Sequence, residues 1–221
     1  MFPPLQIGYH TSMSYPENPD LSHLIPMPVE FIPAGAIFDC DGTLADTMPL
    51  HYKAWRETLD GHGHPAVFPE DQFYAWGGVP AKEILIRLNE QHGLNLDADA
   101  VAHEKEQNYF HRIAEVTPIE AVVAEAKRLY GKCPLAVASG GARFVVEKCL
   151  ENLGIRPLFI ALSTSEDVEH GKPAPDTFLL AAARIGVNPA DCVVYEDAPA
   201  GIEAARRAGM KAVDVTRFIG K

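Results

Sequence analysis

The chain has 221 residues, of which 47% are hydrophobic and 22% are charged, a composition that is ordinary for a globular protein. That length allows one core, or one core with a small accessory domain. The formal net charge of −11 argues against general binding to nucleic acid or to an anionic membrane, because both need a basic face.

Residues 1–33 are rich in proline and show no sustained periodicity. We expect an extended arm there, either packed on the surface or mobile. Three apolar residues, Leu21, Leu24 and Ile25, indicate that part of the arm docks on the rest of the chain. The sequence assigns the arm no role.

The regular fold begins at Ala34, where the apolar run Ala34–Phe38 is typical of a buried parallel strand. Further runs of this kind are Leu135–Ala138 and Cys192–Tyr195, with weaker candidates at Leu158–Leu162 and Ala212–Val215. Helical patterns lie at Ala142–Leu153, Asp176–Ile185 and Pro199–Ala208, each ending near a glycine. Strands that alternate with helices predict an α/β fold with a parallel sheet.

One stretch, residues 48–116, breaks this alternation because it shows helical patterns without a convincing strand. Separate helices are predicted at His51–Leu59, Ala81–His92 and Ala98–Ile113. A helical block inserted after the first strand predicts a cap over the edge of the sheet. We therefore expect an arm (1–33), a core (34–47 and 117–221) and a helical cap (48–116).

Polar side chains follow four of the core segments. The first strand ends in Asp39 and Asp41, the second in Ser139, a later loop holds Lys172, and another strand ends in Glu196 and Asp197. Ligands of open parallel sheets bind at the carboxyl ends of the strands. We expect these side chains to face one volume.

Their chemistry suits phosphoryl transfer. Asp39 and Asp197, with help from Glu196, offer the hard oxygen ligands that Mg²⁺ prefers, and the metal offsets the repulsion between a carboxylate and a phosphate dianion. Asp39 is then the candidate nucleophile. Asp41 is the candidate acid that protonates the leaving alkoxide and later takes a proton from water.

The remaining residues of this set would bind the phosphoryl group. Ser139 and the amides after it, including Gly140, would hold phosphate oxygens, while Lys172 would neutralise charge and steady Asp39. Ser139 alone also fits a helix N-cap, and the Glu196–Asp197 pair alone fits ordinary acids at a helix start. Together and in this order the residues favour catalysis.

These motifs resemble those of the haloacid dehalogenase superfamily: DxDGT at residues 39–43, a serine at 139, a lysine at 172 and an acidic pair at 196–197. The resemblance covers Ala34 to about Val215. It implies a Rossmann-like core, a helical cap that opens and closes, a magnesium cofactor, and a metal ligand from the backbone carbonyl of Asp41.

Two longer stretches, KPAPDTF at 172–178 and EDAPAGIEAARRAG at 196–209, look like the branch that contains β-phosphoglucomutase and small sugar phosphatases. Within it, His51–Leu59 looks most like bacterial phosphatases that act on fructose 1-phosphate. The mutase carries a cap arginine after a Gly-Val pair, where this chain has Ala81. The resemblance therefore favours a small sugar phosphate as substrate and hydrolysis over mutase chemistry.

The cap residues are less clearly assigned. His51, Lys105 and Asn108 either reach the sugar or are ordinary polar residues, and Lys105 falls where the mutase-like cap has a lysine. Arg143, at a helix start where the macrodipole disfavours a cation, is another candidate substrate contact. The two tryptophans of the chain, at 55 and 76, are expected in the core of the cap.

Rival functions are a phosphosugar mutase, a dehalogenase, which the presence of Asp41 disfavours, and a catalytically silent binding protein. The four cysteines form no CxxC pair, so we expect small buried hydrophobes and a reducing cytoplasm. No apolar run approaches the roughly 20 residues that span a bilayer, and the N-terminus lacks the layout of a signal peptide. A monomer is favoured.

Overall fold

The computed structural model describes residues 22–27, 30–76 and 79–218. Most of the proline-rich arm, including Leu21, therefore lies outside the described residues, as do Gly77 and Gly78, which belong to the stretch compared with the mutase arginine.

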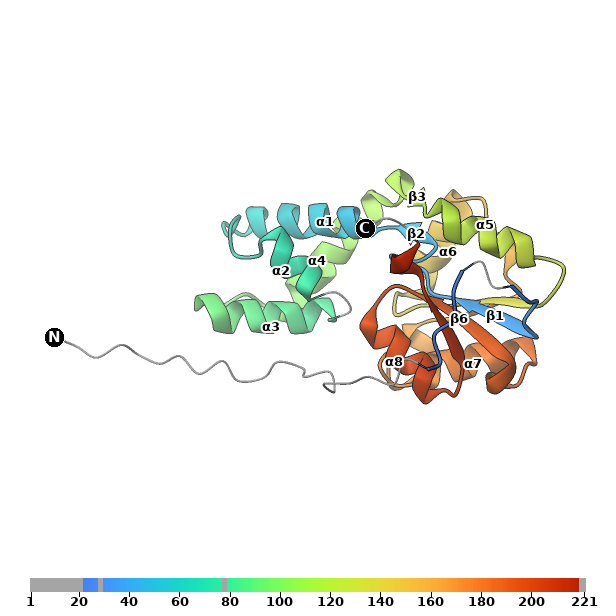
Figure 1. Cartoon of the computed structure of the whole chain (residues 1–221). Helices are drawn as coiled ribbons and strands as arrows, with labels where there is room; N and C mark the ends of the chain where they lie inside the picture. The colour runs from blue at the N-terminus through green and yellow to red at the C-terminus, as the bar shows by residue number, and fades with distance from the viewer. Residues whose placement is uncertain (1–21, 28–29, 77–78, 219–221) are drawn as a thin grey trace.

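A parallel five-stranded sheet forms the centre of the core (Figure 1). Its strands run in the order β5-β4-β1-β6-β7. Every residue of β1, β4 and β6 is buried, because helices cover both faces, and this explains why these strands read as continuous apolar runs. The bounds are β1 Gly35–Phe38, β4 Leu135–Ala138, β5 Ala161–Ser163, β6 Cys192–Glu196 and β7 Lys211–Asp214.

Two helical layers enclose the sheet (Figure 1). Helices α5 (Glu120–Leu129) and α6 (Arg143–Asn152) pack with Phe38 in one apolar cluster. Helices α7 (Asp176–Ile185) and α8 (Pro199–Arg207) pack in another cluster on the opposite face. The predicted parallel α/β sheet is thereby confirmed.

The inserted helices form a separate body beside the core, seen at the left of Figure 1. They are α1 (Met48–Gly61), α2 (Glu70–Ala75), α3 (Ala81–His92) and α4 (Ala98–His111), and we call them the cap. The cap has its own apolar cluster, in which Trp55 is buried and Trp76 is partly buried, as predicted for both tryptophans.

Two short strands connect the cap to the core. β2 (Ala45–Asp46) pairs antiparallel with β3 (Thr117–Pro118), so the chain enters and leaves the cap through adjacent segments. Strands of two residues carry no periodicity, so this pair is not predicted from the sequence. Helices α2 and α5 are not predicted either, although α5 has apolar residues at helical spacing (Val122, Val123, Ala126, Leu129).

The predicted strand at 158–162 is displaced. Residues Arg156–Leu158 form a 3-10 turn with a proline at its start, and β5 begins only at Ala161. The apolar character of Leu158 and Phe159 reflects packing against the core rather than strand pairing.

The arm docks at the edge of the sheet, as its apolar residues predicted. The amide of Ile25 donates to the carbonyl oxygen of Ala212 (2.8 Å), and the amide of Ala212 donates to the carbonyl oxygen of His23 (3.0 Å). Leu24 packs against the cluster of α7 and α8. This segment pairs with β7, which is otherwise an edge strand.

The four cysteines are free thiols, three of them buried and Cys133 half-buried. None of the helices in the described part of the chain has the length and apolar character needed to cross a bilayer.

Candidate active site

The candidate site lies where three neighbouring strands end. β1 is followed by Asp39 and Asp41, β4 by Ser139, and β6 ends at Glu196 with Asp197 next. Because β4 and β6 are the two hydrogen-bonded neighbours of β1, their carboxyl ends bring these side chains to one edge of the sheet.

Lys172 ties two of the acids together. Its Nζ donates to Asp39 Oδ1 (2.6 Å) and to Glu196 Oε2 (2.7 Å). Burial alone would lower the pKa of Lys172, but the charges of Asp39 and Glu196 outweigh it, so the pKa is raised and the ammonium stays charged. The pKa of Asp39 is raised by burial, against the opposing charge of Lys172.

The acids at this edge suit a divalent cation. Carboxylate oxygens of Asp39, Glu196 and Asp197 lie within 4.8 Å of one another. Burial, reinforced by the charge of Asp39, raises the pKa of Glu196 to about 8 and that of Asp197 to about 7. One lysine does not balance these acids, and an all-oxygen set is what Mg²⁺ prefers.

Two glycines make room for the acids. Gly42 has φ = +84°, and a Cβ there would lie 2.3 Å from Asp197 Oδ2, so no side chain fits. Its neighbour Thr43 donates from Oγ1 to Asp197 Oδ1 (2.9 Å). A Cβ on Gly201 would lie 2.0 Å from the carboxyl carbon of Glu196. Sequence reasoning missed Gly201, because a glycine inside a helix is recognised as functional only when its neighbour is known.

Asp41 occupies a different environment from Asp39. Its side chain is 31% exposed, and it lies 3.4 Å from Ser139 Oγ and 3.8 Å from His51 Nε2. Burial raises the pKa of Asp41, but the nearby His51 imidazole, with smaller contributions from Thr47 and Lys105, outweighs burial and lowers the pKa.

The cap contributes a pair of polar side chains, one buried and one half-buried, to this side of the site. Lys105, on α4 and only 4% exposed, lies with Nζ 2.9 Å from His51 Nδ1 on α1. Because an ammonium only donates, Nδ1 accepts and the proton of a neutral His51 is on Nε2, which faces Asp41. Burial and the charge of Lys105 lower the pKa of His51, which favours that neutral form.

The aromatic ring of Tyr109 supports the pair. It stacks on the His51 imidazole with ring centroids 3.7 Å apart, and Nζ of Lys105 lies over the Tyr109 ring, 5.6 Å from its centroid. Tyr109 is not among the predicted site residues, although it lies one helical turn after Lys105.

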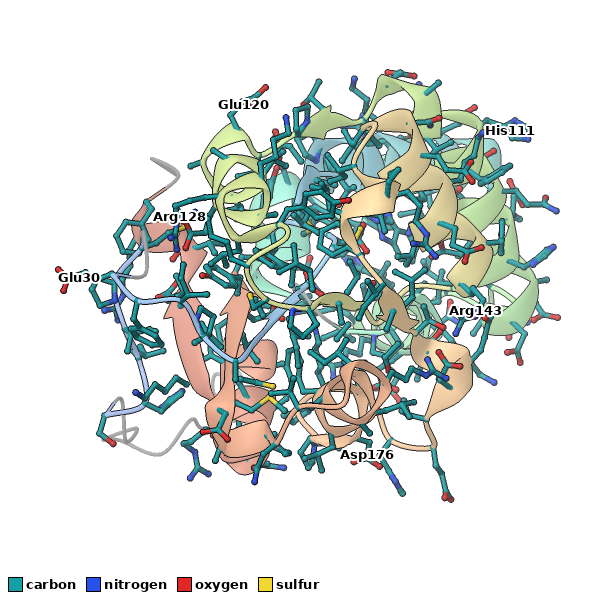
Figure 2. The ribbon with its side chains drawn as sticks, turned by 90° about the vertical axis from the view of Figure 1, so that its right-hand side faces the viewer. Glu30, His111, Glu120, Arg128, Arg143 and Asp176 are labelled. Carbon is teal, nitrogen blue, oxygen red and sulfur yellow. The ribbon has the colours of Figure 1, made fainter. Side chains whose placement is uncertain are left out.

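The other predicted substrate contacts have partners of their own. Asn108 donates from Nδ2 to Thr58 Oγ1 (2.9 Å), between α4 and α1. Arg143 is labelled in Figure 2. Its guanidinium pairs with Asp167, which lies in the loop after β5. Gly140 is exposed at the turn after β4. In that turn the amide of Gly141 donates to Ser139 Oγ (3.0 Å). The alternative interpretation of Ser139 as a helix N-cap is wrong, because α6 begins at Arg143 and its N-cap is Ala142.

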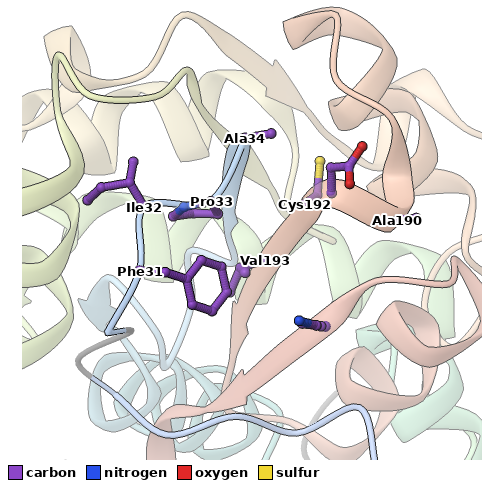
Figure 3. Close-up of a pocket in the computed structure, with 9 residues that line it drawn as sticks. Phe31, Ile32, Pro33, Ala34, Ala190, Cys192 and Val193 are labelled. Atoms are coloured by element: carbon purple, nitrogen blue, oxygen red, sulfur yellow. The ribbon is translucent and has the colours of Figure 1, made fainter.

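Two hollows in the described part of the chain are lined by none of the candidate site residues. One, of about 180 Å³, is lined by Phe31, Pro33, Cys192 and their neighbours (Figure 3). Since β1 and β6 begin there, it lies at the opposite end of the sheet from Asp39. The other, of about 200 Å³, lies between the arm and residues 214–218.

Comparisons with known proteins agree with this geometry. Residues 33–209 match the family model described as haloacid dehalogenase-like hydrolase. An Escherichia coli (strain K12) protein named fructose-1-phosphate phosphatase YqaB is 43% identical over 182 residues, which cover 82% of this chain and 96% of that protein. The β-phosphoglucomutase of Bacillus subtilis (strain 168) is 34% identical over 190 residues, 81% of each chain.

A solved structure is also similar. The crystal structure of CbbY from Rhodobacter sphaeroides in complex with phosphate matches with a TM-score of 0.70 and 26% identity, covering 82% of this chain and 85% of that chain.

Proposed function

The chain belongs to the haloacid dehalogenase-like hydrolase family, and from this membership we propose that it hydrolyses a phosphate monoester of a small sugar, fructose 1-phosphate or a close analogue, through an aspartyl phosphate on Asp39. The 43% identity to a fructose-1-phosphate phosphatase over nearly all of that protein supports the substrate class.

One observation carries the proposal: the two acids that follow β1 have different surroundings. Asp39 is buried and bonded to Lys172, whereas Asp41 is partly exposed and faces Ser139 and His51. Two carboxyls whose environments differ in this way are suited to different roles, one as nucleophile and one as acid and base.

In the first step an oxygen of Asp39 forms a bond to phosphorus while the bond from phosphorus to the sugar oxygen breaks. Asp41 is ionised in the free protein, but the phosphate dianion beside it raises its pKa, so Asp41 takes up a proton when the substrate binds. That proton passes to the departing oxygen, and the sugar leaves as a neutral alcohol. Lys172 lies against Asp39 and would meet the charge on the phosphoryl oxygens.

In the second step a water oxygen attacks phosphorus, and the bond between phosphorus and Asp39 breaks. Asp41, now ionised, takes a proton from that water. Inorganic phosphate leaves, and Asp39 and Asp41 return to their starting states.

Magnesium, when bound, would offset the repulsion between Asp39 and the phosphate dianion. We assign it to Asp39 and Asp197, with Glu196 and the backbone carbonyl of Asp41 as further ligands. Both oxygens of Glu196 already accept hydrogen bonds, from Lys172 and from the amide of Ala198, so this residue would also act by orienting Lys172.

For the substrate we assign Ser139 and the amide of Gly140 to the phosphate, and His51 and Lys105 to sugar oxygens near the leaving group. Asn108 and Arg143 already have partners, so their contact with substrate requires an exchange of hydrogen bonds.

A phosphosugar mutase must also bind the second phosphate of a bisphosphate intermediate. At Ala81, the first residue of α3, the side chain carries no charge. Hydrolysis is therefore the favoured outcome. A cytoplasmic location and a monomeric state stay predictions.

The proposal is tested by incubating the purified protein with a panel of sugar phosphates and Mg²⁺ and measuring released phosphate and isomerised sugar. We expect phosphate release that is strongest with ketose or hexose monophosphates, and its loss on chelation. Asp39→Asn is the matched inactive control. Isomerised sugar after addition of trace bisphosphate would favour the mutase, and no turnover of any ester would overturn the proposal.

A further inference from the structure

The loop after β5 holds the loop after β4. We call residues Ser139–Arg143 the phosphate loop and Thr164–Asp167 the clamp loop. The amide and the hydroxyl of Ser165 both donate to the carbonyl oxygen of Gly141, at 3.2 and 3.1 Å. The phosphate loop is thus fixed by its neighbour as well as by its own turn.

Asp167 is the centre of this arrangement. Its carboxylate accepts from the amide (2.8 Å) and the hydroxyl (2.9 Å) of Thr164, from two guanidinium nitrogens of Arg184 (2.9 and 3.0 Å), and from Arg143. Beside it, the carboxylate of Glu166 accepts from the amide of Arg143 (3.1 Å), the first residue of α6.

This centre links three elements of the core. Arg184 belongs to α7, Arg143 is the last residue of the phosphate loop and the first of α6, and Thr164 follows β5. The side chain of Asp167 is only 15% exposed. Hydrogen bonds from Arg184 outweigh its burial and hold its pKa well below the ordinary value, so it is a carboxylate throughout the neutral range.

We propose that Asp167 is a positioning residue that fixes the phosphate loop in the shape that receives the phosphoryl group. This inference rests on the proposed function and deepens it. The guanidinium of Arg143 is already bound by Asp167, so the phosphate is held by Ser139, the loop amides and Lys172 rather than by that guanidinium.

Removing the negative charge would have a defined consequence. Arg143 and Arg184 would lose their shared anion and repel each other, and the start of α6 would shift with the phosphate loop. Since phosphate binding depends on the direction of the loop amides, the affinity for phosphate should fall while Asp39, Asp41 and Lys172 stay in place.

A matched control is available on the same core. Glu203 on α8 also binds two arginines, Arg206 (2.7 and 2.8 Å) and Arg207 (2.6 Å), far along the chain from the clamp loop. Glu203→Gln therefore removes a carboxylate with two arginine partners without touching the phosphate loop.

The test compares wild type, Asp167→Asn and Glu203→Gln, all loaded with Mg²⁺. We expect Asp167→Asn to raise KM and the inhibition constant of inorganic phosphate by about tenfold, with kcat within about threefold of wild type. Glu203→Gln should change neither constant. If Asp167→Asn does not fold, Arg184→Gln, which removes the anchor of Asp167 on α7, should raise the same two constants.

Constants for Asp167→Asn within twofold of wild type would overturn the inference, as would an equal change in Glu203→Gln. Calorimetric titration with inorganic phosphate tests the role of Asp167 separately from the proposed function. A wild type that binds phosphate but hydrolyses no ester contradicts the proposed function alone, and weaker phosphate binding by Asp167→Asn would then still support the role of Asp167. A wild type that does not bind phosphate contradicts both.

Discussion

The strand ends of the core and the helices of the cap supply the same site in different ways. In the core the polar side chains follow buried strands directly, so the sheet fixes their positions. In the cap, Lys105 and His51 come from two helices and are oriented by each other and by Tyr109. We therefore expect the core to carry out the chemistry and the cap to adjust its rate.

The largest effect is expected at the core nucleophile. Asp39→Asn keeps the shape of the side chain but removes the attacking charge, so turnover should fall by about 10³-fold or more with the fold intact. Steady-state kinetics and circular dichroism would measure both. Activity within tenfold of wild type would contradict the assignment of Asp39 as the nucleophile.

The second core acid should have the next largest effect. Asp41→Asn removes the group that transfers protons, and kcat should fall by at least about 10²-fold. An activated ester with a good leaving group needs less protonation, so the loss should be smaller for that substrate. Equal losses for both substrates would contradict the acid role.

The cap should respond more weakly. Lys105→Met removes the donor that orients His51, and we expect a fall in kcat/KM of about tenfold, since Asp41 keeps its contact with Ser139. Lys82→Met is the matched control, because Lys82 forms an exposed ion pair with Asp99 elsewhere in the cap. A loss as large as that of Asp41→Asn would show that Lys105 takes part in the chemical step, and it would contradict the assignment of the chemistry to the core.

The smallest expected effect concerns the acid stability of the core. The hydrogen bonds of Arg206 and Arg207 lower the pKa of Glu203 to about 2 from an ordinary value of 4.5. A carboxyl whose pKa is lower in the folded than in the unfolded protein stabilises the fold at pH values above the unfolded pKa. This contribution is lost as the pH falls from about 4.5 to about 2. The difference in Tm between wild type and Glu203→Gln should therefore be present at pH 7 and shrink below pH 4.5. A difference that is constant with pH would contradict it.

The same contrast explains what sequence reasoning could reach. Buried parallel strands such as Leu135–Ala138 read as continuous apolar runs, and acids placed at the carboxyl ends of such strands, such as Asp39 and Glu196, must meet at one edge. The proximity of these side chains could therefore be predicted from their positions at the carboxyl ends of parallel strands.

Other features depend on distances that no local pattern contains. Asp167 is one acid in a polar loop, and its role emerges only when α6 and α7 bring Arg143 and Arg184 to it. The orientation of Lys105 toward His51 depends on how α4 rotates against α1. The β2–β3 pair is two residues long on each side and joins segments that are far apart in the chain.

The central claim is that Asp39 becomes phosphorylated. It is tested most directly by a crystal structure of the protein with Mg²⁺ and fluoroberyllate, a mimic of the phosphoryl group. We expect beryllium bonded to a carboxylate oxygen of Asp39, with Lys172 against its fluorides. Beryllium bonded to Asp41, or to any other side chain, would contradict the mechanism.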